Sequence, residues 1–325
     1  MKAIIVKAPG GPLELVEVQL PEPGPGEVLV KIGAAPVNPS DLAVIRRGQG
    51  GEFVPFIPGL EGAGVVVKAG KGILPRLWLN RRVACSPKKG SGGTWAEYMV
   101  TDAGHCFPLN SKISTEQGSM TLVNPLTALD FVAIAKRGGY RAMINNAAAS
   151  SLGRMLELLC MKNNIILINI VRSREKAGEL GKKGSRYVLI SSEPEFEARL
   201  SELAAKLEAR LLFDSVCGEG FPSLLKAMPD KSTIYIYGNL SPSEYISVNP
   251  RELLSRDISI KGYYLANRVR EQGVLKKMRN IITVGKLMSS GMSPVIRTKF
   301  PLAETQKAID TYLSAMSEGK VLIIP

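Results

Sequence analysis

The sequence predicts an α/β protein with two domains, and three observations lead to this fold class. The chain of 325 residues has 45% hydrophobic and 22% charged residues, typical of a globular protein long enough for two domains. Residues 1 to about 115 alternate in short runs broken by Gly and Pro, whereas strand and helix patterns alternate from about Ser119. We therefore expect a mostly-β domain at 1–118, joined by 286–325, and a doubly wound α/β domain at 119–285.

The first domain is expected to consist of short strands. Alternation typical of half-buried strands occurs in LELVEVQLPEPGPGEVLVKIGAAPVN, GAGVVVKAG and RRVACS, and in the opening MKAIIVKAPG. Because the strand pattern begins at the first residues, we expect no signal or transit segment and a cytoplasmic location.

The second domain alternates strands with helices. The expected strands are RAMINNA, IILINIV, YVLIS, RLLFDSV, STIYIYG and ISIKGYY, and the expected helices are SLGRMLELLCMKN, REKAGELGKKG, EPEFEARLSELAAKLEA and FPSLLKAMP. Such an order predicts a parallel sheet with right-handed crossovers and the strand count of a dinucleotide-binding domain. After about Gly285 we expect irregular chain, a helix in LAETQKAIDTYLSAMSEG and a closing strand in KVLIIP that joins the first domain.

Composition argues against several protein classes. No apolar run approaches the roughly 20 residues that span a bilayer, so we expect no membrane partner. The four cysteines lack CxxC spacing and His105 is the single histidine, which disfavours a disulfide framework or a zinc site and indicates packing roles for the thiols. The net charge of +13 favours a solvated basic surface, and nucleic-acid binding stays open as the less favoured alternative.

The segment INNAAASSLGR, residues 144–154, occupies the place of a dinucleotide-binding turn between a strand and a helix. Such turns carry three glycines, for the tight turn, for the approach of the pyrophosphate and for helix packing. Gly153 supplies the last, while Ala148 and Ser150 or Ser151 replace the others with small residues. The serines add hydroxyl donors at a helix N-terminus, which favours anions. The alternative is a plain strand-to-helix turn.

The end of the second strand bears on the choice of cofactor. About 20 residues after the turn, an acidic residue would bind the ribose 2′-hydroxyl of NAD. Here the segment NIVRSREK has Arg172 and Arg174 and no acid at the strand end. Two guanidinium groups suit a 2′-phosphate, so the sequence predicts NADPH. The alternative is a basic surface cluster.

Together these residues resemble the medium-chain dehydrogenase/reductase superfamily over nearly the whole chain, closest to its zinc-independent quinone oxidoreductases and 2-enoyl thioester reductases. The segments that carry the resemblance are AAPVNPSDL (34–42), PGLEGAGVVV (58–67), GGTWAEYMV (92–100), VNPLTAL (123–129), AAASSLG (147–153), VRSR (171–174), FDSVCG (213–218), IYIYGNLS (234–241) and GKVLIIP (319–325). The resemblance implies a GroES-like mostly-β catalytic domain and a Rossmann-fold cofactor domain.

The resemblance also implies that metal is absent. Zinc-dependent members have a cysteine near the position of Asn38 and a His-Glu pair where this chain has Leu60-Glu61. Leucine cannot ligate zinc, and the lobe that holds structural zinc is missing. Glu61 is therefore expected to be a structural acid.

Cofactor contacts carried over from the reductase branch cover six segments. These are Asn124 and Thr127 along the nicotinamide and its ribose, Ser150, Ser151, Leu152 and Gly153 at the pyrophosphate, Arg172, Ser173 and Arg174 at the 2′-phosphate, Tyr237, Gly238, Asn239 and Leu240 in the loop after the fifth strand, Tyr263, Tyr264 and Leu265 over the nicotinamide, and Lys320 from the C-terminal tail. The alternatives are strand packing for the tyrosines and a solvated position for Lys320.

The resemblance predicts an NADPH-dependent oxidoreductase that transfers hydride to a quinone or another α,β-unsaturated carbonyl compound. Enoyl thioester reductases carry a tyrosine proton donor after the NPSD motif, whereas LAVIRRGQGGEFVPF has none and places Gln49 near that position. An amide cannot deliver a proton as a phenol does, so quinone or enone reduction, with a solvent proton, is favoured over enoyl-CoA or enoyl-ACP reduction.

Asn38 is the candidate catalytic residue, orienting the substrate or the nicotinamide ribose, and a turn role before Pro39 is the alternative. Asp41 is expected to cap a helix. The strands STIYIYG and ISIKGYY are expected at the sheet edge, where they would form a homodimer. A non-enzymatic nucleotide-binding or RNA-binding protein is the rival interpretation.

Overall fold

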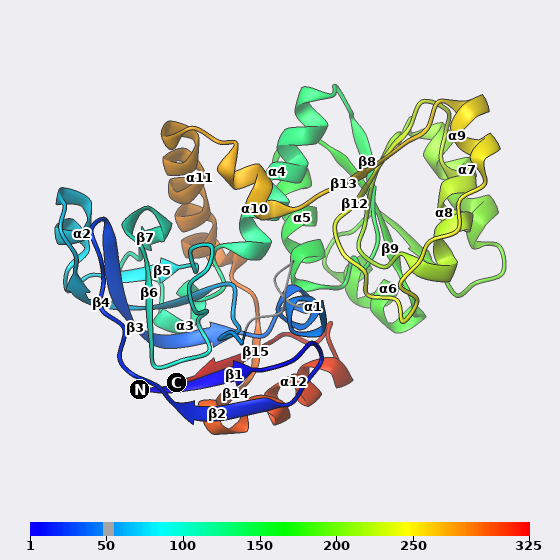
Figure 1. The fold of residues 1–325 in the computed structure, drawn as a ribbon. Helices are drawn as coiled ribbons and strands as arrows, with labels where there is room; N and C mark the ends of the chain where they lie inside the picture. Colours follow the sequence, from blue (N-terminus) through cyan, green and yellow to red (C-terminus); the bar gives the residue numbers. More distant parts are fainter. Residues whose placement is uncertain (48–54) are drawn as a thin grey trace. The chain divides into compact units, whose positions relative to one another are not determined.

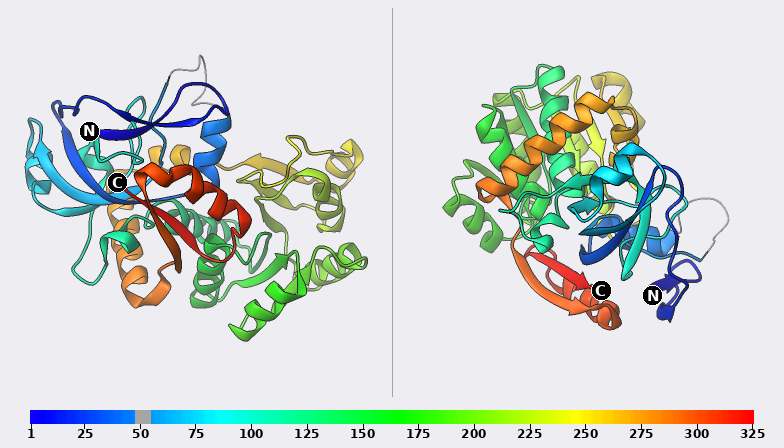
Figure 2. Two further views of the ribbon diagram at one scale, coloured as in Figure 1. Left: turned by 90° about the horizontal axis from the view of Figure 1, so that it is seen from below. Right: turned by 90° about the vertical axis from the view of Figure 1, so that its left-hand side faces the viewer.

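The computed structural model describes residues 1–47 and 55–325. These residues form two compact units: Met1–Leu126 with Val274–Pro325, called unit 1, and Thr127–Gly273, called unit 2. Both ends of the chain lie in unit 1 (Figures 1 and 2). The units change at 126/127 and 273/274, where the sequence predicts 118/119 and 285/286. The first change falls inside a continuous helix, which leaves no signal in the composition.

Unit 1 contains a seven-stranded sheet and a separate β-hairpin. Its strands are β1 (Lys2–Val6), β2 (Leu13–Glu17), β3 (Glu27–Pro36), β4 (Gly62–Ala69), β5 (Arg82–Cys85), β6 (Tyr98–Asp102), β7 (Cys106–Pro108), β14 (Ile296–Pro301) and β15 (Lys320–Ile324). Its helical elements are α1 (Pro39–Arg47), α2 (Ile73–Trp78), η1 (Ala103–His105), α3 (Thr115–Gly118), the start of α4 (Val123–Arg137), α11 (Val274–Leu287), η3 (Met288–Met292), η4 (Leu302–Glu304) and α12 (Thr305–Ser314).

The sheet of unit 1 has the order β14-β15-β3-β4-β5-β7, and β6 pairs with β3 as well. The C-terminal strand β15 lies antiparallel to β3, with Leu322 opposite Pro36, and α12 packs on β14 and β15 (Figure 2). The long strand β3 is buried over most of its length, and the core of this unit includes the fully buried Trp95 and Val30. The C-terminal strand is thereby paired with the strand that leads to Asn38.

Unit 2 is a parallel sheet of six strands with connecting helices (Figure 1). Its strands are β8 (Ala142–Asn145), β9 (Ile166–Val171), β10 (Tyr187–Ile190), β11 (Leu211–Asp214), β12 (Thr233–Ile236) and β13 (Ser259–Gly262). Its helical elements are the rest of α4, α5 (Ser151–Lys162), α6 (Arg174–Lys182), α7 (Phe196–Lys206), η2 (Gly218–Gly220), α8 (Phe221–Ala227), α9 (Pro250–Arg256) and α10 (Leu265–Arg270).

The strand order of unit 2 is β10-β9-β8-β11-β12-β13, and each neighbouring pair is parallel. Numbered from β8, this is the order 3-2-1-4-5-6 of a Rossmann fold, so the predicted fold class is confirmed. Continuous apolar runs such as Ala142–Asn145 and Leu211–Asp214 are wholly buried, as a sheet covered on both faces requires.

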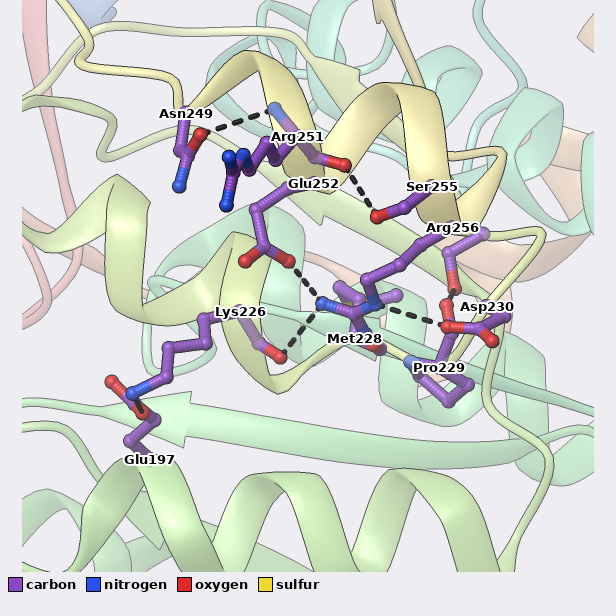
Figure 3. Close-up of polar contacts among 11 residues, drawn as sticks. Glu197, Lys226, Met228, Pro229, Asp230, Asn249, Arg251, Glu252, Ser255 and Arg256 are labelled. Atoms are coloured by element: carbon purple, nitrogen blue, oxygen red, sulfur yellow. Dashed lines mark hydrogen bonds and ion pairs between the residues drawn. The ribbon is translucent and has the colours of Figure 1, made fainter.

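The far edge of this sheet differs from the expectation in one respect. β13 is the edge strand, but β12 pairs with both β11 and β13 and is interior. Just before β13, Arg256 binds Asp230, Glu252 and carbonyl oxygens at the end of α8, which fastens α9 to the body of the unit (Figure 3). Helices α9, α10 and α11 were not predicted, because their residues lie outside the alternation of strands and helices in the sequence.

Within residues 1–47 and 55–325, no helix has both the length and the apolar character that crossing a bilayer requires.

Candidate functional site

The carboxyl ends of β8 and β11 lie side by side in unit 2, at the point where the strand order reverses. Parallel α/β sheets bind ligands outside the strand ends at such a switch point. Each strand ends in a buried polar residue and is followed by another: Asn145 and then Asn146 for β8, and Asp214 and then Ser215 for β11. The predicted dinucleotide turn, within residues 144–154, begins at this position.

The backbone of the turn differs from the predicted assignment by one residue. Ala147, rather than Ala148, has a left-handed conformation with φ of 50°, a conformation that normally favours glycine. Ala148 is fully buried and donates its N–H to Ile170 O at 3.2 Å, in the neighbouring strand. The tight-turn glycine is therefore replaced at Ala147, by the smallest residue that has a Cβ atom.

Ser150 and Gly153 fix the start of α5. The Ser150 hydroxyl accepts a hydrogen bond from Gly153 N at 3.1 Å, which makes Ser150 the N-cap. A Cβ atom on Gly153 would lie 2.2 Å from Ala148 O, so only glycine allows the helix to approach the turn this closely. Ser151 opens the helix and is half-buried, while Leu152 is buried. The glycine expected for helix packing is present and sterically required.

Arg172, Ser173 and Arg174 follow β9, the strand next to β8. Ser173 caps α6 by accepting from Lys176 N at 3.3 Å. Arg174 is 86% exposed and its Nε binds Glu193 Oε1 at 3.1 Å, whereas exposed Arg172 has no ion pair within the described residues. The guanidinium groups are thus on the surface beside the switch point, with one partly neutralised.

A hydrogen-bond network joins the strand ends. Asn146 donates from Nδ2 to Asp214 Oδ1 and accepts from Ser215 N at 2.8 Å. The same Asp214 oxygen accepts from Val216 N at 2.8 Å and Cys217 N at 3.0 Å. Asp214 thereby holds the loop after β11 in place, and sequence analysis did not select it because aspartate at a strand end is common.

The predicted tyrosines take different positions. Tyr237 is half-buried after β12 and donates to Asn145 Oδ1 at 3.3 Å, and its ring lies edge-on against Phe131 at 5.0 Å between centroids. Tyr263 is buried and packs edge-on against Phe131 at 4.9 Å, which is the packing role named as its alternative. Burial raises the pKa of both phenols. Tyr264 is 56% exposed and directly precedes half-buried Leu265.

The loop after β12 contacts the loop after β11. Leu240 N donates to Ser215 O at 2.9 Å, and a Cβ atom on Gly238 would lie 3.1 Å from the same carbonyl oxygen. Asn239 is exposed and donates from Nδ2 to Ser243 O at 3.1 Å. This segment therefore belongs to the switch-point rim of unit 2.

Unit 1 contains a second polar centre, formed by Asn38, Glu61 and Lys320, each at most 3% exposed. Asn38 donates from Nδ2 to Glu61 Oε1 at 3.0 Å, and Lys320 Nζ donates to Asn38 Oδ1. Both ends of the amide are thus bound to charged groups, which fixes its orientation. Lys320 is therefore buried and hydrogen-bonded, not solvated. It reaches this cluster because it begins strand β15, which pairs with β3.

Glu61 connects this centre to the start of α4. Its Oε2 accepts from Leu122 N at 3.0 Å and Val123 N at 2.9 Å, where the positive end of the helix dipole favours a carboxylate. Asn124 lies in that first turn and is half-buried. The expectation that Glu61 is a structural acid agrees with these bonds. Thr127, one turn further, is buried in unit 2.

Asp41 lies beside the same cluster at the start of α1. Its two carboxylate oxygens accept from Asn38 N at 2.8 Å and Leu60 N at 2.9 Å, as expected for a capping acid. Burial raises its pKa to about 7, against these bonds. Burial also raises the pKa of Glu61 and lowers that of Lys320, while their mutual attraction opposes both shifts.

In the described part of the chain, no three histidine, cysteine, aspartate or glutamate side chains form a group that could hold a metal ion. The four cysteines are buried and free. Gln49, the residue expected where related reductases carry a tyrosine, lies outside the described residues.

Comparisons with known proteins agree with this arrangement. Residues 24–111 match the family model of the alcohol dehydrogenase GroES-like domain. A proposed NADPH:quinone reductase from Mesorhizobium loti is 31% identical, with a TM-score of 0.91 over 100% of this chain and 98% of that chain. The mitochondrial enoyl-[acyl-carrier-protein] reductase of Dictyostelium discoideum is 31% identical over 252 residues, covering 74% of this chain and 69% of that protein.

A third relative shares the fold at lower identity. Escherichia coli quinone oxidoreductase, solved in complex with NADPH, is 23% identical, with a TM-score of 0.86 over 100% of both chains. The chain therefore belongs to the medium-chain dehydrogenase/reductase superfamily of oxidoreductases, in the zinc-independent branch of quinone oxidoreductases and enoyl thioester reductases.

Proposed function

We propose that this oxidoreductase uses NADPH to reduce a quinone or another α,β-unsaturated carbonyl compound without zinc. The observation that carries the proposal is the switch-point turn of unit 2, in which Gly153 lets α5 approach and Ser150 caps it. A pyrophosphate at this turn would face the positive end of α5 and the remaining hydroxyl hydrogens of two serines. The cofactor supplies the hydride, and the protein orients it.

Arg172 and Arg174 support NADPH over NADH. They follow the strand whose end, in NAD-binding relatives of this fold, carries an acid for the ribose 2′-hydroxyl. A guanidinium group matches the geometry of a phosphate and stays charged at any working pH. Arg172 is the stronger candidate, because Arg174 already binds Glu193. The name of the M. loti protein, which mentions NADPH, and the NADPH bound to E. coli quinone oxidoreductase favour the same cofactor.

This chain lacks the tyrosine that enoyl thioester reductases carry after the NPSD motif. We therefore favour quinones or enones over enoyl thioesters as acceptors. When hydride reaches the carbon β to a carbonyl, negative charge develops on the carbonyl oxygen, which must be stabilised and later protonated. Quinone and enone products can take this proton from water. Enoyl-[acyl-carrier-protein] reduction is the second candidate, because mitochondrial enzymes of that name are among the relatives of this chain.

Asn38 has a positioning role in this proposal. At 1% exposure it is linked through Glu61 to the first turn of α4, which carries Asn124, the proposed nicotinamide contact. The chain of hydrogen bonds from Lys320 through Asn38 to Glu61 would fix the position of that turn. Tyr237 and Tyr264 are the proposed cofactor contacts among the tyrosines, and Tyr263 would support unit 2 by packing against Phe131.

The test is a fluorescence titration with NADPH and NADH, for the parent protein and for Arg172→Ala. We expect tight NADPH binding, little NADH binding, and at least about a tenfold loss of NADPH affinity in the variant, since a charge-assisted phosphate contact is lost. The matched control is Arg251→Ala, an exposed arginine on α9, which should leave binding unchanged.

Turnover with quinones and small enones would then be measured against an enoyl thioester. Binding of neither nucleotide would contradict the proposal and favour the rival structural or RNA-binding role. Turnover of the thioester alone would make enoyl thioesters, and not quinones or enones, the acceptor class.

We also propose that the chain forms a homodimer through β13. Its outer edge has no strand partner within the described residues, and unpaired edges favour strand pairing. Analytical ultracentrifugation of the parent and of Ile260→Pro would test this. Proline cannot donate a backbone hydrogen bond, so this substitution in β13 should weaken strand pairing between two copies. A monomeric parent would refute it.

A further inference from the structure

Helix α2 has apolar side chains on both of its sides. Trp78 is half-buried and donates from Nε1 to Ala103 O at 2.9 Å, and Pro75 is buried, so these two residues attach the helix to unit 1. Ile73, Leu74 and Leu77 are 82%, 44% and 58% exposed. A surface helix normally turns polar residues outward, and folding does not require these three.

The exposed apolar residues continue on neighbouring chain. Leu79 follows α2 directly and is 42% exposed. We call this set the α2 surface; its residues are Ile73, Leu74, Leu77 and Leu79.

The charged residues on α2 and next to it in the sequence are all basic. Residues 64–82 contain five basic residues and no acidic one. Lys68 pairs with Glu22, while Lys71, Arg76 and Arg81 are exposed and form no ion pair among the residues that the structure describes. Asp102, directly before the Ala103 that Trp78 contacts, is a nearby exposed acid. Three exposed cations without ion pairs, Lys71, Arg76 and Arg81, therefore border the apolar side chains against one such acid.

Three kinds of partner can be compared. A second copy of the chain would bring the same basic residues against each other, because a two-fold interface pairs a surface with itself. RNA would use the positive charge, but aliphatic side chains offer no surface on which bases stack. An anionic lipid bilayer satisfies both properties, since its headgroups attract lysine and arginine and its acyl region accepts Ile73 and Leu77.

We propose that the α2 surface binds the surface of an anionic phospholipid bilayer. Ile73, which is the most exposed of the set, would enter the boundary between headgroups and acyl chains, with Lys71 and Arg76 at the headgroups. The sequence analysis gives no expectation of a membrane partner because no segment is long and apolar enough to span a bilayer; a peripheral contact needs no such segment, and this proposal replaces that expectation. The inference does not depend on the proposed reaction or on its cofactor.

The experiment is co-sedimentation of the full chain with vesicles of phosphatidylcholine, alone or mixed with phosphatidylglycerol. We expect binding to the mixed vesicles at low salt, little binding to phosphatidylcholine alone, and release at high salt. The double variant Ile73→Glu/Leu77→Glu should reduce the bound fraction about tenfold or more, because it removes apolar insertion and adds like charge to the lipid. Both residues are exposed, so circular dichroism should show unchanged folding.

The matched control is Leu254→Glu, at an 85% exposed leucine on α9 in unit 2, which should bind vesicles like the parent. Failure of the parent to bind mixed vesicles would overturn the proposal. Equal binding by the double variant would do the same. A change of oligomeric state in the double variant, measured by size-exclusion chromatography without lipid, would instead assign the α2 surface to a second copy of the chain.

Discussion

Lys320 Nζ donates a hydrogen bond to Asn38 Oδ1, although 282 residues separate them in the sequence. The two residues meet because β15 pairs with β3, whose end leads into Asn38. With Asp41 and Glu61 nearby, the cluster has two carboxyl groups and one ammonium in a place that water does not reach. A buried charge set of this kind is sensitive to the loss of any member.

Lys320→Met is expected to destabilise the protein by about 3 kcal/mol near pH 8, because it leaves two buried carboxyl groups without their cation. Lys320 lowers the pKa of both Asp41 and Glu61, so these pKa values rise further in the variant. The folded variant then binds protons that its unfolded chain releases, and its stability increases as the pH falls. The loss should therefore be smaller near pH 5.

Urea unfolding at both pH values measures this effect. Lys307→Met, at a lysine whose side chain is 68% exposed on α12, is the control and should change the unfolding free energy by less than about 0.5 kcal/mol. A loss that does not depend on pH would mean that Lys320 acts through packing alone.

Asp41 should make the protein less stable as the pH rises from about 4 to about 7. Its folded pKa of about 7 lies above the ordinary value of 3.8, so within this range the folded state binds a proton that the unfolded state has lost. Asp41→Asn removes the titration but leaves one of two backbone N–H groups without its acceptor, a cost independent of pH. The stability difference between parent and variant should narrow across this range in urea titrations. A difference that widens would show that the carboxylate is the favoured form.

Tyr237→Phe should weaken the junction between β12 and β8 only slightly. The phenol donates to Asn145 at 3.3 Å, a long hydrogen bond, while the ring packs against Phe131 in either residue. We expect a loss of about 1 kcal/mol in unfolding free energy. Tyr237→Ala removes the ring as well and should cost about 3 kcal/mol or more. Equal losses in the two variants, compared by thermal unfolding, would mean that the hydroxyl rather than the ring holds the junction.

Much of the fold could be predicted from the sequence, because local patterns determine it. Alternation of apolar strands and helices gave the parallel sheet, and the spacing from strand to Gly153 located the dinucleotide turn. Ala147 was missed as the turn residue because alanine carries no signal for a left-handed backbone. The contact between Lys320 and Asn38 was missed because it depends on long-range strand pairing, and a lysine before a strand is usually solvated.

The partly exposed side chain of Arg256 should contribute strongly to the free energy of unfolding of unit 2. Its guanidinium group binds Asp230 at 3.0 Å and Lys226 O at 3.1 Å, and also binds Glu252 and Met228 O (Figure 3). Arg256→Met keeps the length of the side chain but removes every donor, and it should cost about 2 kcal/mol. Arg251→Met, on the same helix at an exposed position, is the control and should have little effect. Equal unfolding free energies for the two variants would contradict this role.

Gly153→Ala should separate the geometry of the turn from ordinary helix propensity. A methyl group there would lie 2.2 Å from Ala148 O, a backbone atom that can move only with the turn itself. We expect a loss of about 2 kcal/mol and a displaced α5 N-terminus, although alanine is the better helix former. Gly178→Ala in α6 is the matched control, since a methyl group at Gly178 meets no atom within 4 Å and should stabilise by about 0.5–1 kcal/mol. Urea unfolding with and without NADPH distinguishes the two effects. If Gly153→Ala unfolds at lower urea and is no longer stabilised by NADPH, the close approach of α5 is needed for cofactor binding. If alanine raises the free energy of unfolding at both glycines, the turn can relax around a side chain.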